Sequence, residues 1–137
     1  MINIVAYLTT VVIFFAIDMV WLGVVAKNFY FTRLGSLLKD QPDMLIAAGF
    51  YLFFVIGLVF FAVKPALDSN SLKTALLYGA LFGVFTYATY DLTNLATLKN
   101  WPVSVTIVDM VWGGVISGVS ASAGFLLTRW IANSFLS

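Results

Sequence analysis

Four long apolar runs dominate the chain, and each is long enough to cross a lipid bilayer. They extend over about residues 4–26, 44–63, 72–98 and 103–127. A helix rises ~1.5 Å per residue, so about 20 residues span the ~30 Å hydrocarbon core of a membrane. Backbone polar groups find no water there, and a helix satisfies them internally. The sequence therefore predicts an all-α integral membrane four-helix bundle with both termini on the same side.

The composition supports a membrane protein and argues against a nucleic-acid partner. The chain is 62% hydrophobic and 9% charged, whereas a soluble domain is about a quarter charged. We expect one transmembrane domain over residues 1–137. The seven lysines and arginines are scattered, so we expect no nucleic-acid partner. The first run lacks a basic start and carries Asp18, so we expect it to span the membrane rather than act as a cleaved signal.

Three residue types that carry much of enzyme chemistry are missing. The chain has no cysteine, histidine or glutamate. We therefore expect no haem, iron–sulfur or thiol chemistry, and Ser-His-Asp catalysis is excluded. Acid–base or metal chemistry would have to come from the six aspartates.

The segments around the second run suggest how it is placed. Lysines and aromatic residues alternate before it, which predicts either a short interfacial helix within residues 28–40 or an ordinary connecting loop. The run itself is rich in Phe and free of acidic and basic residues. We expect a lipid-facing wall that begins at Gln41-Pro42-Asp43 and ends at Lys64-Pro65.

The third and fourth apolar runs differ from the second in carrying polar or small residues. The second half of the third run is polar, so we expect it to face the bundle interior or a hydrated cavity. Its polar residues include Thr86, Thr89, Thr93, Asn94 and Thr97. The fourth run carries two stripes of small residues that favour close helix packing and offer a homo-oligomer interface. These stripes are Gly114, Gly118 and Ser122, and Gly113, Ser117 and Ala121.

A short motif occurs twice. Asp-Met-Val-Trp-Leu-Gly-Val begins at Asp18 and Asp-Met-Val-Trp-Gly-Gly-Val begins at Asp109, with six of seven positions identical. In a four-helix topology the first and fourth helices run in opposite directions. The chain therefore presents a local inverted echo between them, an arrangement that surrounds binding sites in larger transporters.

Three aspartates lie at nearly one depth. Asp18 precedes Lys27 by nine residues, Asp91 precedes Lys99 by eight, and Asp109 follows Lys99 by ten. At ~1.5 Å per residue, each lies ~12–15 Å below its flanking lysine. A carboxylate near a helix centre costs ~2.5–3.5 kcal/mol on insertion scales, so we expect the three to converge rather than face lipid separately.

Neighbouring polar and aromatic residues complete the predicted site. Helix spacing places Trp21 beside Asp18, Trp112 beside Asp109, and Tyr87, Tyr90 and Asn94 around Asp91. Without a cation at this depth, either a carboxyl group is protonated or a cation is bound. A divalent ion held by the three aspartates and Asn94 is one candidate. Alternatively, the aspartates only hydrogen-bond the helices together.

Basic residues surround the predicted site on the side of the first and third loops. This rim consists of Lys27, Arg33, Lys39 and Lys99. It suits an anionic headgroup, and its slight excess of positive charge favours a cytoplasmic location.

The chain resembles a known family at these same positions. Tyr90-Asp91-Leu92-Thr93-Asn94, Trp101-Pro102, Asp109 with Trp112-Gly113, and Asp18 with Trp21-Leu22-Gly23 are similar to the bacterial membrane family called domain of unknown function 2177. The resemblance covers essentially the whole chain and implies a multi-pass protein of the bacterial inner membrane. The family has no established activity, but its association with genes for membrane fatty-acid modification points toward lipid chemistry.

Three hypotheses follow. In the first, Asp18, Asp91 and Asp109 form a catalytic site that binds and modifies a membrane lipid or another apolar substrate. Asp91 would act as acid–base or metal ligand, Tyr87, Tyr90 and Asn94 would orient a polar group, and Trp21 and Trp112 would line the apolar part. The second is a proton- or cation-coupled transporter acting as a homo-oligomer. The third is a non-catalytic subunit or assembly factor of a larger membrane complex.

Overall fold

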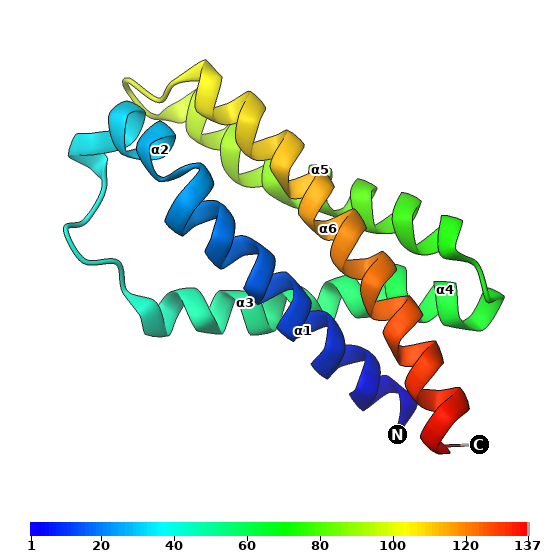
Figure 1. Cartoon of the computed structure of the whole chain (residues 1–137). Coiled ribbons are helices and arrows are strands. Elements are labelled where there is room, and N and C mark those ends of the chain that lie inside the picture. The colour runs from blue at the N-terminus through cyan, green and yellow to red at the C-terminus, as the bar shows by residue number, and fades with distance from the viewer. Residues whose placement is uncertain (137) are drawn as a thin grey trace.

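The computed structural model describes residues 1–136, and its regular elements in that range are helices. Four long helical segments are joined by short turns, apart from the longer connection between α1 and α3 (Figure 1). The elements are α1 (Ile2–Val20) with a π-turn (Trp21–Val25), α2 (Lys27–Leu34), a 3-10 turn (Gly35–Leu37), α3 (Met44–Leu58) with a π-turn (Val59–Val63), α4 (Lys64–Ser69), α5 (Leu72–Thr97), and α6 (Val103–Ile131) with a π-turn (Ala132–Leu136).

The α5–α6 hairpin is the closest helix pair. The two helices run antiparallel and lie side by side from their connecting turn, and they separate toward the start of α5 and the end of α6 (Figure 1). A Cβ atom added at Gly83 would collide with the carbonyl oxygen of Gly113, and one added at Gly118 would lie 3.3 Å from the Cβ of Ala80. Both predicted stripes on α6 therefore pack against α5 within the chain. This confirms their packing role but corrects the expectation that they are free for a homo-oligomer interface.

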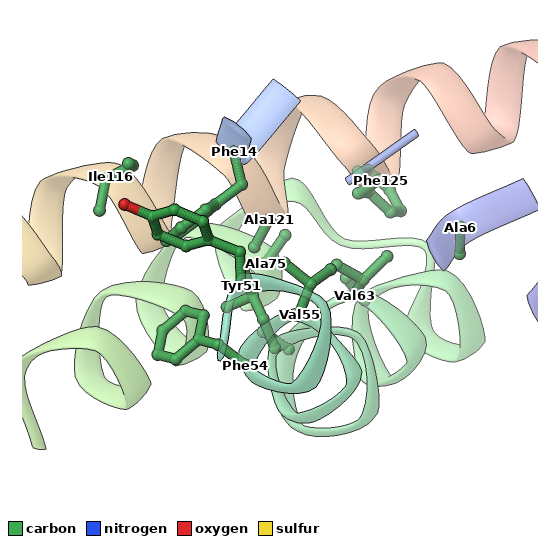
Figure 2. Close-up of a cluster of buried hydrophobic side chains, with 13 residues drawn as sticks. Ala6, Phe14, Tyr51, Phe54, Val55, Val63, Ala75, Ile116, Ala121 and Phe125 are labelled. Atoms are coloured by element: carbon green, nitrogen blue, oxygen red, sulfur yellow. The ribbon is translucent and has the colours of Figure 1, made fainter. Parts of the chain in front are cut away.

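The other long helices cover this hairpin. Helix α1 lies antiparallel to α6, and α3 crosses behind α1 at a steep angle while α4 continues beyond α6 (Figure 1). The N-terminus lies at the same end as the end of α6 (Figure 1). Phe14 of α1 contacts Tyr51 and Phe54 of α3, with ring centroids 5.7 and 5.1 Å apart (Figure 2). Phe14, Leu58, Ile116 and Phe125 are fully buried in this core.

The second apolar run is not a simple lipid-facing wall. Tyr51, Phe54, Val55 and Leu58 are buried on its inner face, although its other face is exposed. The run also does not end at Lys64-Pro65, since α4 continues to Ser69. The N–H of Lys64 donates to the carbonyl of Val59 five residues back, and this wider turn comes just before proline, which has no N–H of its own.

Three of the described helical segments are long and apolar enough to cross a membrane. They are Ile2–Val25, Met44–Ser69 and Val103–Phe135. Helix α5 is equally long but carries a polar second half. Its threonines at 89, 93 and 97 are exposed, so this face does not point into the bundle interior, and the alternative of a hydrated cavity stays a prediction. Their hydroxyls donate to backbone carbonyls of the same helix, such as Thr89 to Phe85 at 2.7 Å, so the outward face is satisfied internally.

The stretch after α1 forms a helix rather than an irregular loop. Helix α2 follows a break at Ala26 and packs back onto the α5–α6 turn through a small cluster of Leu34, Trp101 and Val105. Arg33 Nε donates to Ser104 Oγ at 3.1 Å. A helix within residues 28–40 is thus confirmed, and its position in the membrane interface stays a prediction.

The Gly83–Gly113 contact allows a test of the hairpin. We expect Gly83→Ala to lower the free energy of unfolding by ~3 kcal/mol, because its methyl group would meet backbone that cannot move aside. Gly49→Ala is the matched control, since no atom lies within 4 Å of its added Cβ. Thermal unfolding in detergent micelles, followed by circular dichroism, measures both. Equal melting temperatures for the two variants would contradict the close packing.

Candidate functional site

The two copies of the repeated motif meet in the bundle. The indole rings of Trp21 and Trp112 stack with centroids 4.1 Å apart and planes 10° from parallel. Each tryptophan lies three residues after an aspartate of its motif. Helices α1 and α6 run antiparallel (Figure 1), and each aspartate lies one helical turn from its stacked ring.

Asp18 is fully provided with donors. Its side chain is buried, with 4% exposure. Trp112 Nε1 donates to Oδ1 at 3.1 Å, and the Tyr51 hydroxyl donates to Oδ2 through a short hydrogen bond. Asp18 of α1 thus joins α3 and α6 in one polar contact.

Asp109 has an equivalent phenol partner from a different element. The hydroxyl of Tyr30 in α2 donates to Asp109 Oδ1 at 2.9 Å. Trp21 Nε1 in turn lies 3.4 Å from the Tyr30 oxygen, to which it donates. Burial and then the charge of Asp109 raise the pKa of Tyr30 above its ordinary value, so the phenol remains a donor.

Asp91 differs from the other two. Its side chain is 0% exposed, and neither carboxylate oxygen has a donor in the part of the chain that the structure describes. Its direct neighbour is the carboxyl group of Asp109. Two carboxylates only accept hydrogen bonds, so a bond between them exists only when one carries a proton.

The three aspartates form a row rather than one cluster. Asp109 interacts with both Asp18 and Asp91, whereas neither of these two acts on the other. Over residues 1–136, no group of three acidic side chains is placed to hold one metal ion. This arrangement therefore gives no support to the divalent site expected from Asp18, Asp91, Asp109 and Asn94, and metal binding stays a prediction.

A large apolar cavity opens beside this row, and we call it the tail cavity. It has a volume of about 850 Å³ and lies between α1, α3, α5 and α6. Phenylalanines of α3, including Phe50, Phe53 and Phe54, form much of its wall. The predicted residues Trp21, Tyr87, Tyr90 and Trp112 also line it, together with Asp18 and Asp109.

A second cavity of about 820 Å³ lies toward α2, and we call it the head cavity. Its lining includes Lys27, Lys39 and Asp40 as well as Tyr30. Asp91 lines the head cavity, but its carboxylate oxygens are buried. Asp109 is half-buried and lines both cavities.

Some predicted site residues lie elsewhere. Arg33 stacks over the Phe29 ring at 4.1 Å, and neither Arg33 nor Lys99 is among the residues lining these two cavities. Half-buried Asn94 lines neither cavity but interacts with the hydroxyl of Tyr90 one turn away. The predicted rim is therefore reduced to Lys27 and Lys39.

Two residues of the site escaped sequence analysis, namely Tyr51 and Tyr30. Tyr51 follows Asp43 by eight residues, and Asp43 caps the start of α3. The depth rule that grouped the aspartates would have placed Tyr51 at their level, had it been applied to tyrosines. Tyr30 lies on α2 outside the apolar runs, and no spacing in the sequence indicates that it reaches Asp109.

Comparison with known proteins agrees with this picture of several membrane-spanning helices. A family model described as "Predicted membrane protein (DUF2177)" matches residues 3–126. The chain belongs to this family. The DUF2177 match confirms the resemblance inferred from Tyr90–Asn94 and the repeated motif, and it identifies a multi-pass membrane protein. No curated protein and no solved structure matches the chain.

The Tyr51–Asp18 bond can be tested by stability. We expect Tyr51→Phe to cost about 1.5–3 kcal/mol, because it removes a donor from a buried carboxylate. Tyr78→Phe, at an exposed tyrosine of α5, is the control and should be near neutral. We would measure unfolding in micelles for both variants, for Asp18→Asn, and for the double mutant Asp18→Asn with Tyr51→Phe. The double-mutant cycle then gives the coupling energy between Asp18 and Tyr51. Additive losses would mean that the two side chains do not interact.

Proposed function

We propose that this DUF2177 protein binds a membrane lipid or another apolar substrate at the two cavities, with Asp109 and Asp91 as an acid–base pair at its polar group. One observation carries the proposal. Asp91 is fully buried without a donor and lies directly behind Asp109, which borders both cavities.

The cost of burying Asp91 supports a functional role. An ionised carboxylate without a hydrogen bond is strongly unfavourable in an apolar interior. A proton shared between Asp91 and Asp109 removes one charge and supplies the missing hydrogen bond. The pair can then exchange that proton with a substrate group bound at Asp109, and ionisable groups inside membrane segments are functional by default.

The shape and lining of the tail cavity favour a lipid. Its volume of about 850 Å³ falls in the range of small-molecule sites, and aromatic rings dominate its wall. Its lining residues belong to α1, α3, α5 and α6, and the first half of α3 lies apart from α1 and α5 (Figure 1). An acyl chain entering between these helices would leave the polar group of the lipid at Asp109.

Binding is favoured over passage through the bundle. The core residues Phe14, Leu58, Ile116 and Phe125 are fully buried. Phe14 precedes Asp18 on α1, and Ile116 and Phe125 follow Asp109 on α6, so these side chains lie on the side of the aspartates toward both termini. A transporter or a subunit of a larger complex remains the alternative if the lipid test fails.

The test is lipid analysis of cells that express wild type or variants at matched membrane levels. We expect wild type to change the abundance of a lipid species, and Asp109→Asn and Asp91→Asn to abolish that change. Asp68→Asn is the control, since this exposed residue pairs only with Lys64 at the far end. Mass spectrometry of total lipid extracts measures the effect.

Two results would decide against the proposal. One is a lipid profile that does not differ between cells with and without wild type. The other is a change that persists in Asp109→Asn. Proton flux in liposomes and capture of partner subunits would then distinguish the transporter from the assembly role.

A further inference from the structure

The two cavities adjoin each other, and together they have the shape of a site for an amphipathic molecule. Leu22, Tyr90 and Asp109 line both of them. The tail cavity is apolar, whereas the head cavity contains charged side chains. A ligand that fills both must therefore join an apolar chain to a polar group near Asp109.

The head cavity contains charges of both signs that are not paired with each other. Lys27 and Lys39 are the positive groups, and Asp40, Asp91 and Asp109 are the acidic ones. The only salt bridge over residues 1–136 is between Lys64 and Asp68, at the far end of the molecule. A ligand with one charge sign would leave part of this lining unmatched, and a zwitterionic headgroup would match both.

The acidic side of the cavity requires a hydrogen-bond donor. Asp109 is half-buried and accepts one hydrogen bond, from Tyr30, so it can accept a further one from a ligand. A primary ammonium offers three donors, whereas a quaternary ammonium offers none. The lysines, in turn, suit a phosphate.

We propose that the lipid is an aminophospholipid whose primary ammonium binds Asp109, whose phosphate binds Lys27 and Lys39, and whose acyl chain occupies the tail cavity. This inference deepens the function proposed above and rests on it. It names the substrate class of the same site.

The probe is an equimolar mixture of phosphatidylethanolamine, phosphatidylcholine and phosphatidylglycerol with identical acyl chains. Delipidated protein is incubated with the mixture in detergent, and native mass spectrometry measures which lipid it retains. We expect phosphatidylethanolamine to be retained roughly fivefold more than the other two, as one added ion pair would give.

Variants assign the two ends of the headgroup. Asp109→Asn should remove the preference for phosphatidylethanolamine over phosphatidylcholine. Lys27→Gln with Lys39→Gln should lower the retention of all three phospholipids, because each carries a phosphate. Both lysines are exposed, so this double variant should fold. Lys73→Gln, at an exposed position at the start of α5, is the matched control and should behave as wild type.

The outcomes separate this inference from the function on which it rests. Equal retention of the three lipids, or a preference for phosphatidylcholine or phosphatidylglycerol, would overturn the headgroup assignment. So would a preference that persists in Asp109→Asn. If an aspartate-dependent lipid change in cells is nevertheless found, the proposed function stands with another lipid class. If wild type retains no lipid and changes none, both fail.

Discussion

A buried carboxylate needs hydrogen-bond donors, and this requirement determines which helices contact one another at the site. Asp18 receives a phenol from α3 and an indole from α6, and these bonds hold three helices at one level. Asp109 receives its phenol from α2, so a helix outside the apolar runs becomes part of the site. In a bilayer, where apolar surface gives no driving force between helices, such polar contacts and close packing provide the specificity.

The α5–α6 hairpin supplies the second requirement, which is proximity. Asp91 lies six residues before the end of α5, and Asp109 lies six residues after the start of α6. Because Gly83 and Gly113 let the two backbones touch, these carboxyl groups come into direct contact instead of being separated by side chains. The close packing that stabilises the hairpin therefore also brings together Asp91 and Asp109, the pair of carboxyl groups with the fewest hydrogen-bond donors.

The repeated motif gives this site an approximate two-fold order, and its two halves differ in burial and hydrogen bonding. The stacked indoles of Trp21 and Trp112 lie at the centre, and each motif's aspartate has a phenol partner. Asp18 is satisfied and almost fully covered, as expected of a residue that joins helices. Asp109 borders both cavities and has Asp91 behind it, as expected of a residue that meets a ligand.

The sequence alone determined the helical membrane class and the family, and it indicated that the two copies of the repeated motif run antiparallel. The shared depth of the aspartates stays a prediction. Those features follow from spacing along one helix, where rise and face are nearly constant. The tertiary structure decided that Asp91 has no donor over residues 1–136, and that Tyr51 and Tyr30 serve the other two aspartates. It also decided that the small-residue stripes are used within the chain and that α3 diverges to leave the tail cavity. Distances across helices depend on their tilt and on close glycine contacts, and spacing along the chain does not specify either.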